Sequence, residues 1–300
     1  MAKQARSLRG KVAIVTGATG GVGKALSKAL AREGAKVGLC DLDQAKVDQV
    51  VAEIGGDAVG RAIDVTDAEA YSAFMDEVER RLGPLDVLVN VAAIMPIGPF
   101  EAEKDTTSRR IIDINLTAVV LSTKDAARRM KARGSGHIVN VASGAGWVAG
   151  GGGATYVASK FGVVGYSESV ALELHGTGVD ISVVAPAVIQ TEMAAGLKEV
   201  RGLKPSTPED VAEAIVDGLR RPRFAIFQPR AMGAMAFTFS AMPYRLRHAL
   251  ARLAKSDKLL LDFDPSARAA YETRVTAVPA KANGAAAREE AKDAEAAEAR

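Results

Sequence analysis

Short runs rich in valine and isoleucine alternate with longer helical patterns over residues 11–228 of this 300-residue chain. Several runs are apolar at nearly every position, as is typical of strands covered on both faces in a parallel sheet. This order predicts an α/β fold, a doubly wound parallel sheet of seven strands with helices on both faces. The expected strands are 12–16, 36–41, 58–64, 85–90, 137–142, 180–185 and 223–228, and the expected helices are 22–33, 44–54, 68–82, 105–133, 154–175 and 208–219.

The character of the chain changes after residue 228, where it becomes rich in methionine, phenylalanine and alanine and then basic. Leu246, Leu250 and Leu253 share one face of a helical pattern whose other faces carry arginine. From about residue 276 the chain lacks large apolar side chains that could offset the entropy cost of ordering. We expect an N-terminal arm at 1–10, a main domain at 11–228, an amphipathic helical extension at 229–275 and a disordered tail or frayed helix at 276–300.

Charge and cysteine content exclude several classes of protein. The net charge is only +3, and no basic stripe interleaved with aromatic residues occurs in the first 220 residues, so we expect no nucleic-acid partner. The single cysteine, Cys40, lies in an apolar run, which indicates a buried thiol and a reducing compartment. There is no secretory signal pattern and no apolar run of about 20 residues, so we expect a cytoplasmic protein. No spacing of metal ligands is visible, and His137 and His175 are interpreted as structural.

A glycine-rich loop, Thr-Gly-Ala-Thr-Gly-Gly-Val-Gly at 16–23, joins the first expected strand to the first expected helix. Glycines let the backbone turn tightly and approach a pyrophosphate, whose charge the amides at the helix N-terminus stabilise. Because loops also collect glycine for conformational reasons, the strand before and the helix after are what make the pattern specific. It predicts dinucleotide binding by Gly17, Thr19, Gly20, Gly21, Val22 and Gly23.

Asp41 ends the second expected strand, about 20 residues beyond the glycine loop. A carboxylate there can accept hydrogen bonds from the ribose diol of a dinucleotide and would repel a 2′-phosphate. No arginine or lysine stands in the loop or directly after Asp41, so NAD is favoured over NADP. The alternative is that Asp41 is only a turn residue leading to a helix cap at Asp43.

Tyr156 and Lys160 lie four residues apart in an expected helix and therefore share one of its faces. A phenol with a pKa near ~10 is a poor acid or base at neutral pH unless a positive charge favours its anion. Lys160 can supply that charge. The same spacing also arises by chance on solvated helix faces, so the rest of the chain must decide between these readings.

Together these motifs resemble the short-chain dehydrogenase/reductase superfamily, with its Rossmann-type sheet, over about residues 11–228. Asn115 in Ile-Asn-Leu and Ser143 in Val-Ala-Ser match the asparagine and serine of the family's catalytic set. Ala93 and Ala187 depart from the family by replacing customary glycines near the cofactor. The resemblance implies further cofactor contacts from Leu42, Asp64, Val65, Asn90, Ala92, Tyr156, Lys160, Ile189 and Thr191.

The resemblance implies an enzyme that transfers a hydride reversibly between NAD and a secondary alcohol or ketone. Tyr156 would act as acid and base, Lys160 would lower the pKa of its phenol, and Ser143 would donate a hydrogen bond to the substrate oxygen. Asn115 would hold a water that links the lysine to solvent. Ser143 could instead be a capping serine, and Asn115 a satisfied buried amide.

The substrate cleft implied by the family lies beside the catalytic residues. No arginine or lysine occurs at 144–155, which favours a neutral, hydrophobic substrate such as a steroid-like or lipid-like alcohol. A lone tryptophan such as Trp147 is more often a core or lid residue, although it follows Ser143 closely. The expected lining is Ile94, Met95, Ala145, Trp147 and Met193.

Other functions and partners stay open at this point. A non-catalytic NAD sensor of the same fold would be expected to lose Tyr156, Lys160 or Ser143, and a reductase of 3-oxoacyl thioesters would favour NADP. The basic amphipathic stretch at 232–255 could cover the substrate mouth or a neighbouring subunit, lie peripherally on an anionic membrane, or pack as an ordinary helix pair. By resemblance we expect a homodimer or homotetramer.

Overall fold

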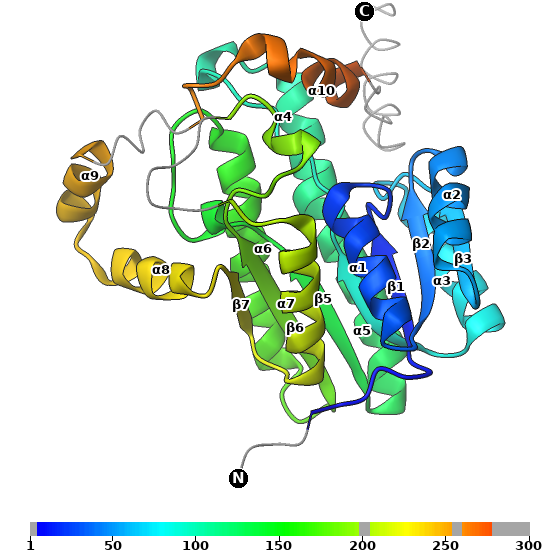
Figure 1. Ribbon diagram of the computed structural model, residues 1–300. Coiled ribbons are helices and arrows are strands. Elements are labelled where there is room, and N and C mark those ends of the chain that lie inside the picture. Colours follow the sequence, from blue (N-terminus) through cyan, green and yellow to red (C-terminus); the bar gives the residue numbers. More distant parts are fainter. Residues whose placement is uncertain (1–4, 198–204, 254–259, 278–300) are drawn as a thin grey trace, which may run out of the picture.

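A parallel sheet of seven strands forms the centre of the molecule, in the order β3-β2-β1-β4-β5-β6-β7 (Figure 1). The computed structural model describes residues 5–197, 205–253 and 260–277. The order reverses between β1 and β4, as expected of a doubly wound sheet, so the predicted fold class is confirmed. The strands are β1 (Val12–Thr16), β2 (Lys36–Asp41), β3 (Ala58–Ala62), β4 (Leu85–Asn90), β5 (Gly136–Val141), β6 (Val179–Pro186) and β7 (Ala225–Gln228).

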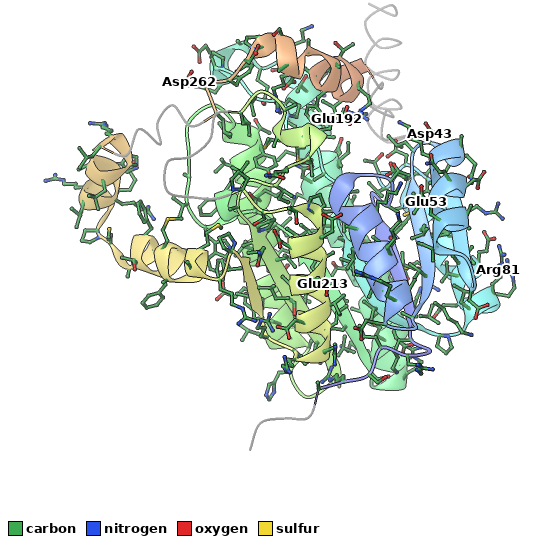
Figure 2. The ribbon with its side chains drawn as sticks, in the orientation of Figure 1. Asp43, Glu53, Arg81, Glu192, Glu213 and Asp262 are labelled. Atoms are coloured by element: carbon green, nitrogen blue, oxygen red, sulfur yellow. The ribbon has the colours of Figure 1, made fainter. Side chains whose placement is uncertain are left out.

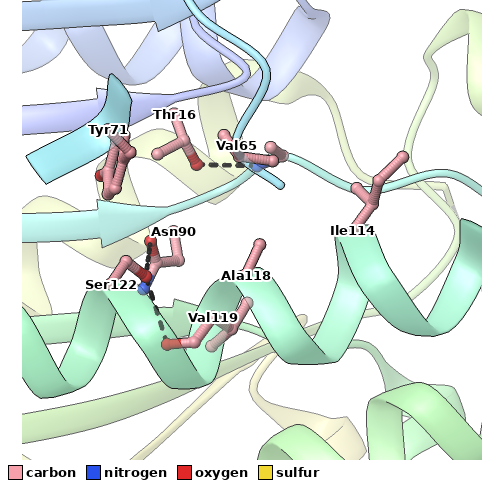
Figure 3. A pocket seen from close by; sticks show the side chains of 9 residues that line it. Thr16, Val65, Tyr71, Asn90, Ile114, Ala118, Val119 and Ser122 are labelled. Carbon is pink, nitrogen blue, oxygen red and sulfur yellow. Dashed lines mark hydrogen bonds between the residues drawn. The ribbon is translucent and has the colours of Figure 1, made fainter. Parts of the chain in front are cut away.

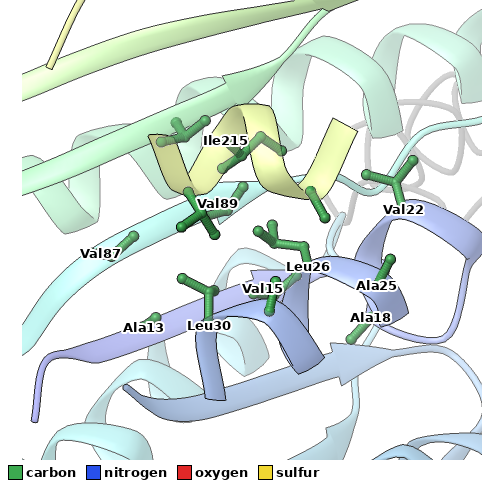
Figure 4. Close-up of a cluster of buried hydrophobic side chains, with 14 of the residues drawn as sticks. Ala13, Val15, Ala18, Val22, Ala25, Leu26, Leu30, Val87, Val89 and Ile215 are labelled. Atoms are coloured by element: carbon green, nitrogen blue, oxygen red, sulfur yellow. The ribbon is translucent and has the colours of Figure 1, made fainter. Parts of the chain in front are cut away.

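Helices cover both faces of the sheet, and each face has its own apolar core. On one face, Leu26 and Leu30 are fully buried against Val15 and Val89 (Figure 4). Burial of such side chains stabilises the fold by roughly 1.5–3 kcal/mol each. The first face carries α1 (Gly21–Arg32), α2 (Gln44–Ile54) and α7 (Pro208–Arg220), and the second carries α3 (Ala68–Leu82), α5 (Ala118–Arg133) and α6 (Ala154–Glu173).

The predicted starts of α2 and α3 and the predicted end of α5 agree with the capping residues in the structure. Asp43 and Asp67 accept hydrogen bonds from Lys46 N at 3.2 Å and Ala70 N at 3.1 Å, so both act as N-caps. Gly134 ends α5 in the left-handed conformation, which glycine adopts without steric cost.

The helix predicted over 105–133 is divided in the structure. It consists of α4 (Asp105–Ile112), a π-helical turn (Asp113–Thr117) and α5. A π-turn inserts an extra residue into the helical ladder, which is frequent at functional sites. No residue pattern in this segment predicts the insertion.

The chain beyond β7 forms α8 (Ala231–Ala241), α9 (Tyr244–Leu253) and α10 (Pro265–Ala277). Figure 1 shows α8 and α9 projecting away from the sheet, whereas α10 returns and lies beside α4. Short 3-10 turns occur at Phe100–Ala102, Gly144–Gly146 and Glu192–Ala194. Residues 278–300 of the predicted tail and residues 254–255 of the basic stretch lie outside the described residues. Among the helices of the described ranges, none is long and apolar enough to cross a membrane.

Candidate active site

The loops that follow β1, β4 and β6 meet at the carboxyl edge of the sheet. A Cβ atom built on Gly17 would lie 2.9 Å from Ala92 Cα, and one on Gly21 would lie 2.8 Å from Thr191 Cγ2. Gly17 also has φ +62°, a conformation that favours glycine. The glycine loop, Ala92 and Thr191 are therefore brought together, at the place where ligands bind in open α/β sheets.

The glycine loop fits a bound pyrophosphate. A Cβ atom on Gly23 would lie 2.1 Å from the carbonyl oxygen of Gly17, so only glycine allows this tight turn into α1. The N-cap of α1 is Gly20, and no side chain caps the helix. Its first backbone N–H groups are therefore available to an anion, which the helix dipole also favours.

Asp41 lies against the same loop. Its Oδ2 accepts hydrogen bonds from Thr19 N at 2.9 Å and Thr19 Oγ1 at 2.6 Å. Its Oδ1 accepts one from Leu42 N at 2.8 Å. The carboxylate thus fixes the glycine loop, which goes beyond a simple turn role, and Oδ1 keeps a lone pair for a further donor.

Three more of the predicted cofactor residues, Val65, Asn90 and Ala92, line one pocket below the loop (Figure 3). Asn90 donates to Asn140 Oδ1 at 2.9 Å and accepts from Ser122 Oγ at 3.0 Å, so its amide is held rigidly. Of the rest, Asp64 binds the backbone and hydroxyl of Thr66, Leu42 is exposed, and Ile189 packs on the first core.

Tyr156, Lys160 and Ser143 are gathered beside the end of β5. Tyr156 and Lys160 are 6% and 2% exposed, which excludes a solvated helix face. Burial raises the pKa of Tyr156, and a hydrogen bond with Ser143 lowers it in part. Burial lowers the pKa of Lys160 to about 8, while its Nζ donates to Val141 O at 3.0 Å and lies 5.8 Å from the centre of the Tyr156 ring.

Asn115 lies in the π-helical turn and is fully buried. Its amide accepts from Ile94 N and donates to Ile94 O, both at 2.9 Å, and it also donates to Ser159 Oγ at 3.2 Å. The extra residue of the turn thus aims the Asn115 side chain at the loop after β4. Its predicted role in holding a water stays a prediction.

Four of the five expected substrate-lining residues share one apolar cluster with Tyr156, namely Ile94, Met95, Ala145 and Met193. Trp147 lies elsewhere, packed with its ring centre 5.3 Å from that of Phe227 and against a separate core cluster. Its assignment to the substrate wall therefore has no support from this packing and stays a prediction.

A comparison with protein families decides what this arrangement is. Residues 11–202 match the family model described as short chain dehydrogenase. The chain belongs to the short chain dehydrogenase family. The predicted resemblance is confirmed, and the chain is a member of a family of oxidoreductases.

Several characterised members of the family are similar to this chain. It is 39% identical over 189 residues to D-threitol dehydrogenase of Mycolicibacterium smegmatis, which covers 62% of this chain and 73% of that protein. It is 39% identical over 219 residues to cis-4-hydroxycyclohexanecarboxylate dehydrogenase of Sinomonas cyclohexanicum, covering 68% and 87%. It is 33% identical over 219 residues to a 3-oxoacyl-(acyl-carrier-protein) reductase of Vibrio harveyi, covering 70% and 90%.

A solved structure of a short chain dehydrogenase/reductase from Burkholderia phymatum, in complex with NAD, superposes with a TM-score of 0.72. It is 26% identical in sequence, and the match covers 83% of this chain and 96% of that one. The similarity therefore extends beyond the segment that the family model matches.

Sequence reasoning missed the part of the site that α10 supplies. Tyr271 and Val275 belong to the same apolar cluster as Tyr156, and the buried guanidinium of Arg268 binds the loops after β4 and β6. The spacing of Arg268, Tyr271 and Val275 at i, i+3 and i+7 places them on one helix face and is the signal that could have found them.

Proposed function

We propose that this chain is an NAD-dependent oxidoreductase that interconverts a neutral, hydrophobic secondary alcohol and its ketone. The observation that carries the proposal is the buried pair of Tyr156 and Lys160, with Ser143 hydrogen-bonded to Tyr156, beside the apolar cluster of Ile94, Met95 and Met193. NAD, when bound, supplies the acceptor of the hydride in oxidation and the donor in reduction.

The phenol oxygen of Tyr156 exchanges the proton of the substrate. In oxidation it accepts the hydroxyl proton, and in reduction it returns a proton to the carbonyl oxygen. Ser143 Oγ donates a hydrogen bond to the same oxygen and stabilises the charge that develops there. Lys160, when protonated, favours the phenolate, and its pKa of about 8 keeps it largely protonated at neutral pH.

Asp41 supports NAD as the cofactor. It faces the glycine loop through Thr19, and its negative charge would repel the 2′-phosphate of NADP. The described residues of the glycine loop (16–23) and of the turn after β2 (42–43) contain no lysine or arginine. The next basic residues along the chain are Lys24 in α1, after the loop, and Lys46 in α2, after the turn. Lys24 pairs with Glu53 at 2.8 Å.

A second candidate is the reduction of a 3-oxoacyl thioester. The observation that favours it is the 33% identity to the reductase of Vibrio harveyi. Asp41 argues against it, because that reading would favour NADP. Parallel assays of NADPH-dependent acetoacetyl thioester reduction and NAD-dependent oxidation of a panel of hydrophobic secondary alcohols, including sterols, distinguish the two.

The proton-transfer role is tested with Tyr156→Phe. We expect a loss of turnover of at least about 100-fold, the lower range for general acid–base catalysis, with the Kd of NADH changed less than about twofold. Tyr166→Phe is the matched control on the same helix, since Tyr166 is half-buried and its hydroxyl donates to Val120 O at 3.2 Å. The assignment is wrong if Tyr156→Phe keeps more than a few per cent of the wild-type activity.

A further inference from the structure

The C-terminal segment 260–277 is bound to three loops at the carboxyl edge of the sheet. Leu260 N donates to Gly151 O at 3.0 Å in the loop after β5, and Asp264 N donates to Gly196 O at 2.8 Å in the loop after β6. Met95 N, in the loop after β4, donates to the Tyr271 hydroxyl at 2.8 Å. The segment therefore contacts the loops after β4, β5 and β6, which carry the predicted substrate residues Met95, Ala145 and Met193.

The backbone of the C-terminal segment packs closely on the backbones of the loops after β5 and β6. A Cβ atom on Gly152 would lie 2.5 Å from the carbonyl carbon of Leu260, and one on Gly196 would lie 2.5 Å from Asp264 O. A side chain at either position would push the segment away. The glycines thus permit main-chain packing of the C-terminal segment on both loops.

Arg268 joins α10 to the two loops that carry predicted substrate residues. Its side chain is 0% exposed, and its guanidinium donates to Met193 O at 2.7 Å, Ala195 O at 3.3 Å and Met95 O. Nε pairs with Glu272 at 2.6 Å, which balances the charge. Burying an arginine is costly unless its donors are satisfied, and here four hydrogen bonds engage all three nitrogens of the guanidinium.

The face of α10 that Arg268 holds down is apolar and lies over the catalytic tyrosine. Tyr271 and Val275 are 4% and 7% exposed and share a cluster with Tyr156, which itself is only 6% exposed. Arg110 of α4 donates to Val275 O at 3.1 Å, and Arg274 pairs at 2.6 Å with Glu192, which is labelled in Figure 2. α10 is therefore tethered along its length.

We propose that α10 is the lid of the substrate site, that Arg268 is the positioning residue that holds it on both walls, and that Tyr271 sets the size of substrate accepted. The inference rests on the proposed alcohol and ketone function. The ligand under this lid is the apolar part of a secondary alcohol, because Tyr271, Val275 and Met95 offer it an apolar surface. Substrate reaches Tyr156 when α10 lifts, and the Arg268 contacts re-form over it.

The role of Arg268 in holding α10 on the two loops is tested first without any substrate, by hydrogen–deuterium exchange of the whole chain. We expect Arg268→Met to speed exchange at residues 94–97 and 193–197 by about 10-fold or more, because about 1.4 kcal/mol of lost tethering is a factor of ten. Arg129→Met is the matched control. Arg129 of α5 lies in a partly exposed network with Asp76, Glu79 and Asp125, none of which belongs to α10 or its partner loops, so its loss destabilises the fold without releasing the lid.

The lid is tested second by kinetics on secondary alcohols of increasing size with NAD. We expect Arg268→Met to raise the KM for alcohol by about 10-fold while the Kd of NADH stays within about twofold, and Arg129→Met to leave both unchanged. Tyr271→Ala should raise kcat/KM for the bulkiest alcohols relative to the smallest by about 10-fold, since it removes the ring from the roof. This second variant keeps the test open if Arg268→Met does not fold.

Unchanged exchange at 94–97 and 193–197 in Arg268→Met, or an unchanged size preference in Tyr271→Ala, would overturn the lid. A wild-type chain that oxidises no alcohol would refute the proposed function instead. In that case the exchange experiment still decides whether Arg268 holds α10 on the two loops.

Discussion

Replacing Asp41 by asparagine should change which dinucleotide the chain prefers. The substitution keeps the shape of the side chain and one carbonyl oxygen for Thr19, whose N–H and hydroxyl lie 2.9 and 2.6 Å from Oδ2. It removes the negative charge. Hydrogen bonds to a charged acceptor are worth roughly 1.5–3 kcal/mol against 0.5–1.5 for neutral ones, so NAD binding should weaken by about 10-fold.

NADP should bind more tightly to Asp41→Asn, because the repulsion between the carboxylate and the 2′-phosphate is lost. Two unit charges about 4 Å apart interact with about 1 kcal/mol in water and about 4 at an effective dielectric of 20, so removing the carboxylate charge should favour NADP by about 5- to 1,000-fold. Together with the weaker NAD binding, Asp41→Asn should shift the ratio of the two Kd values by about 50- to 10,000-fold.

Titration of NADH and NADPH by fluorescence, without substrate, measures this ratio. Asp43→Asn is the control. It also removes one negative charge, two residues from Asp41, but the Asp43 carboxylate caps α2 and does not contact Thr19. A shift below threefold in Asp41→Asn, or an equal shift in Asp43→Asn, would refute the assignment of Asp41 to cofactor selection.

Three further predictions concern the buried lysine, the projecting helices and the assembly. Burial lowers the pKa of Lys160 from 10.5 to about 8, so the unfolded state binds the proton of this lysine more tightly than the folded state. The free energy of unfolding of the wild type should therefore rise between pH 8 and 10.5 by up to about 3 kcal/mol. Urea unfolding should show this rise, and Lys160→Met should lack it. The exposed Phe237 and Leu253, with the arginines of α9, predict binding to anionic vesicles, which flotation with and without residues 229–300 tests; no binding of the full chain would remove this prediction. Exposed Phe161 and Leu172 on α6 favour the predicted dimer or tetramer, and a single monomer mass by light scattering at micromolar concentration would contradict it.

The sequence predicted the central fold well because its strands carry their own signal. Runs such as 85–90 are buried on both faces, so apolar residues occur at nearly every position and mark the strand without knowledge of its neighbours. The glycine loop was equally visible, since the backbone turn itself requires glycine at 17 and 23. The strand predicted over 58–64 ends earlier, at Ala62, where Asp64 instead turns the chain through Thr66.

The position of α10 could not be predicted in the same way. Arg268 and Met95 are 173 residues apart, and a single arginine in a helical pattern ordinarily indicates a solvated face. Asp264 does carry a local signal, since its carboxylate accepts from Ser266 N and caps α10, so the existence of the helix was readable although its position was not. Trp147 shows the opposite case, because proximity to Ser143 in sequence did not place it with the apolar cluster of Tyr156.

Asn115 and the proposed lid meet at one short stretch of backbone. Ile94 has both its N–H and its carbonyl bonded to the Asn115 amide, while the next residue, Met95, has its N–H bonded to Tyr271 and its carbonyl to Arg268. Two adjacent residues thus connect the π-helical turn on one side to α10 on the other. A lid that rises with Tyr271 must release the Met95 groups while Asn115 still holds Ile94, so opening can widen the cleft without disturbing the catalytic residues beneath it.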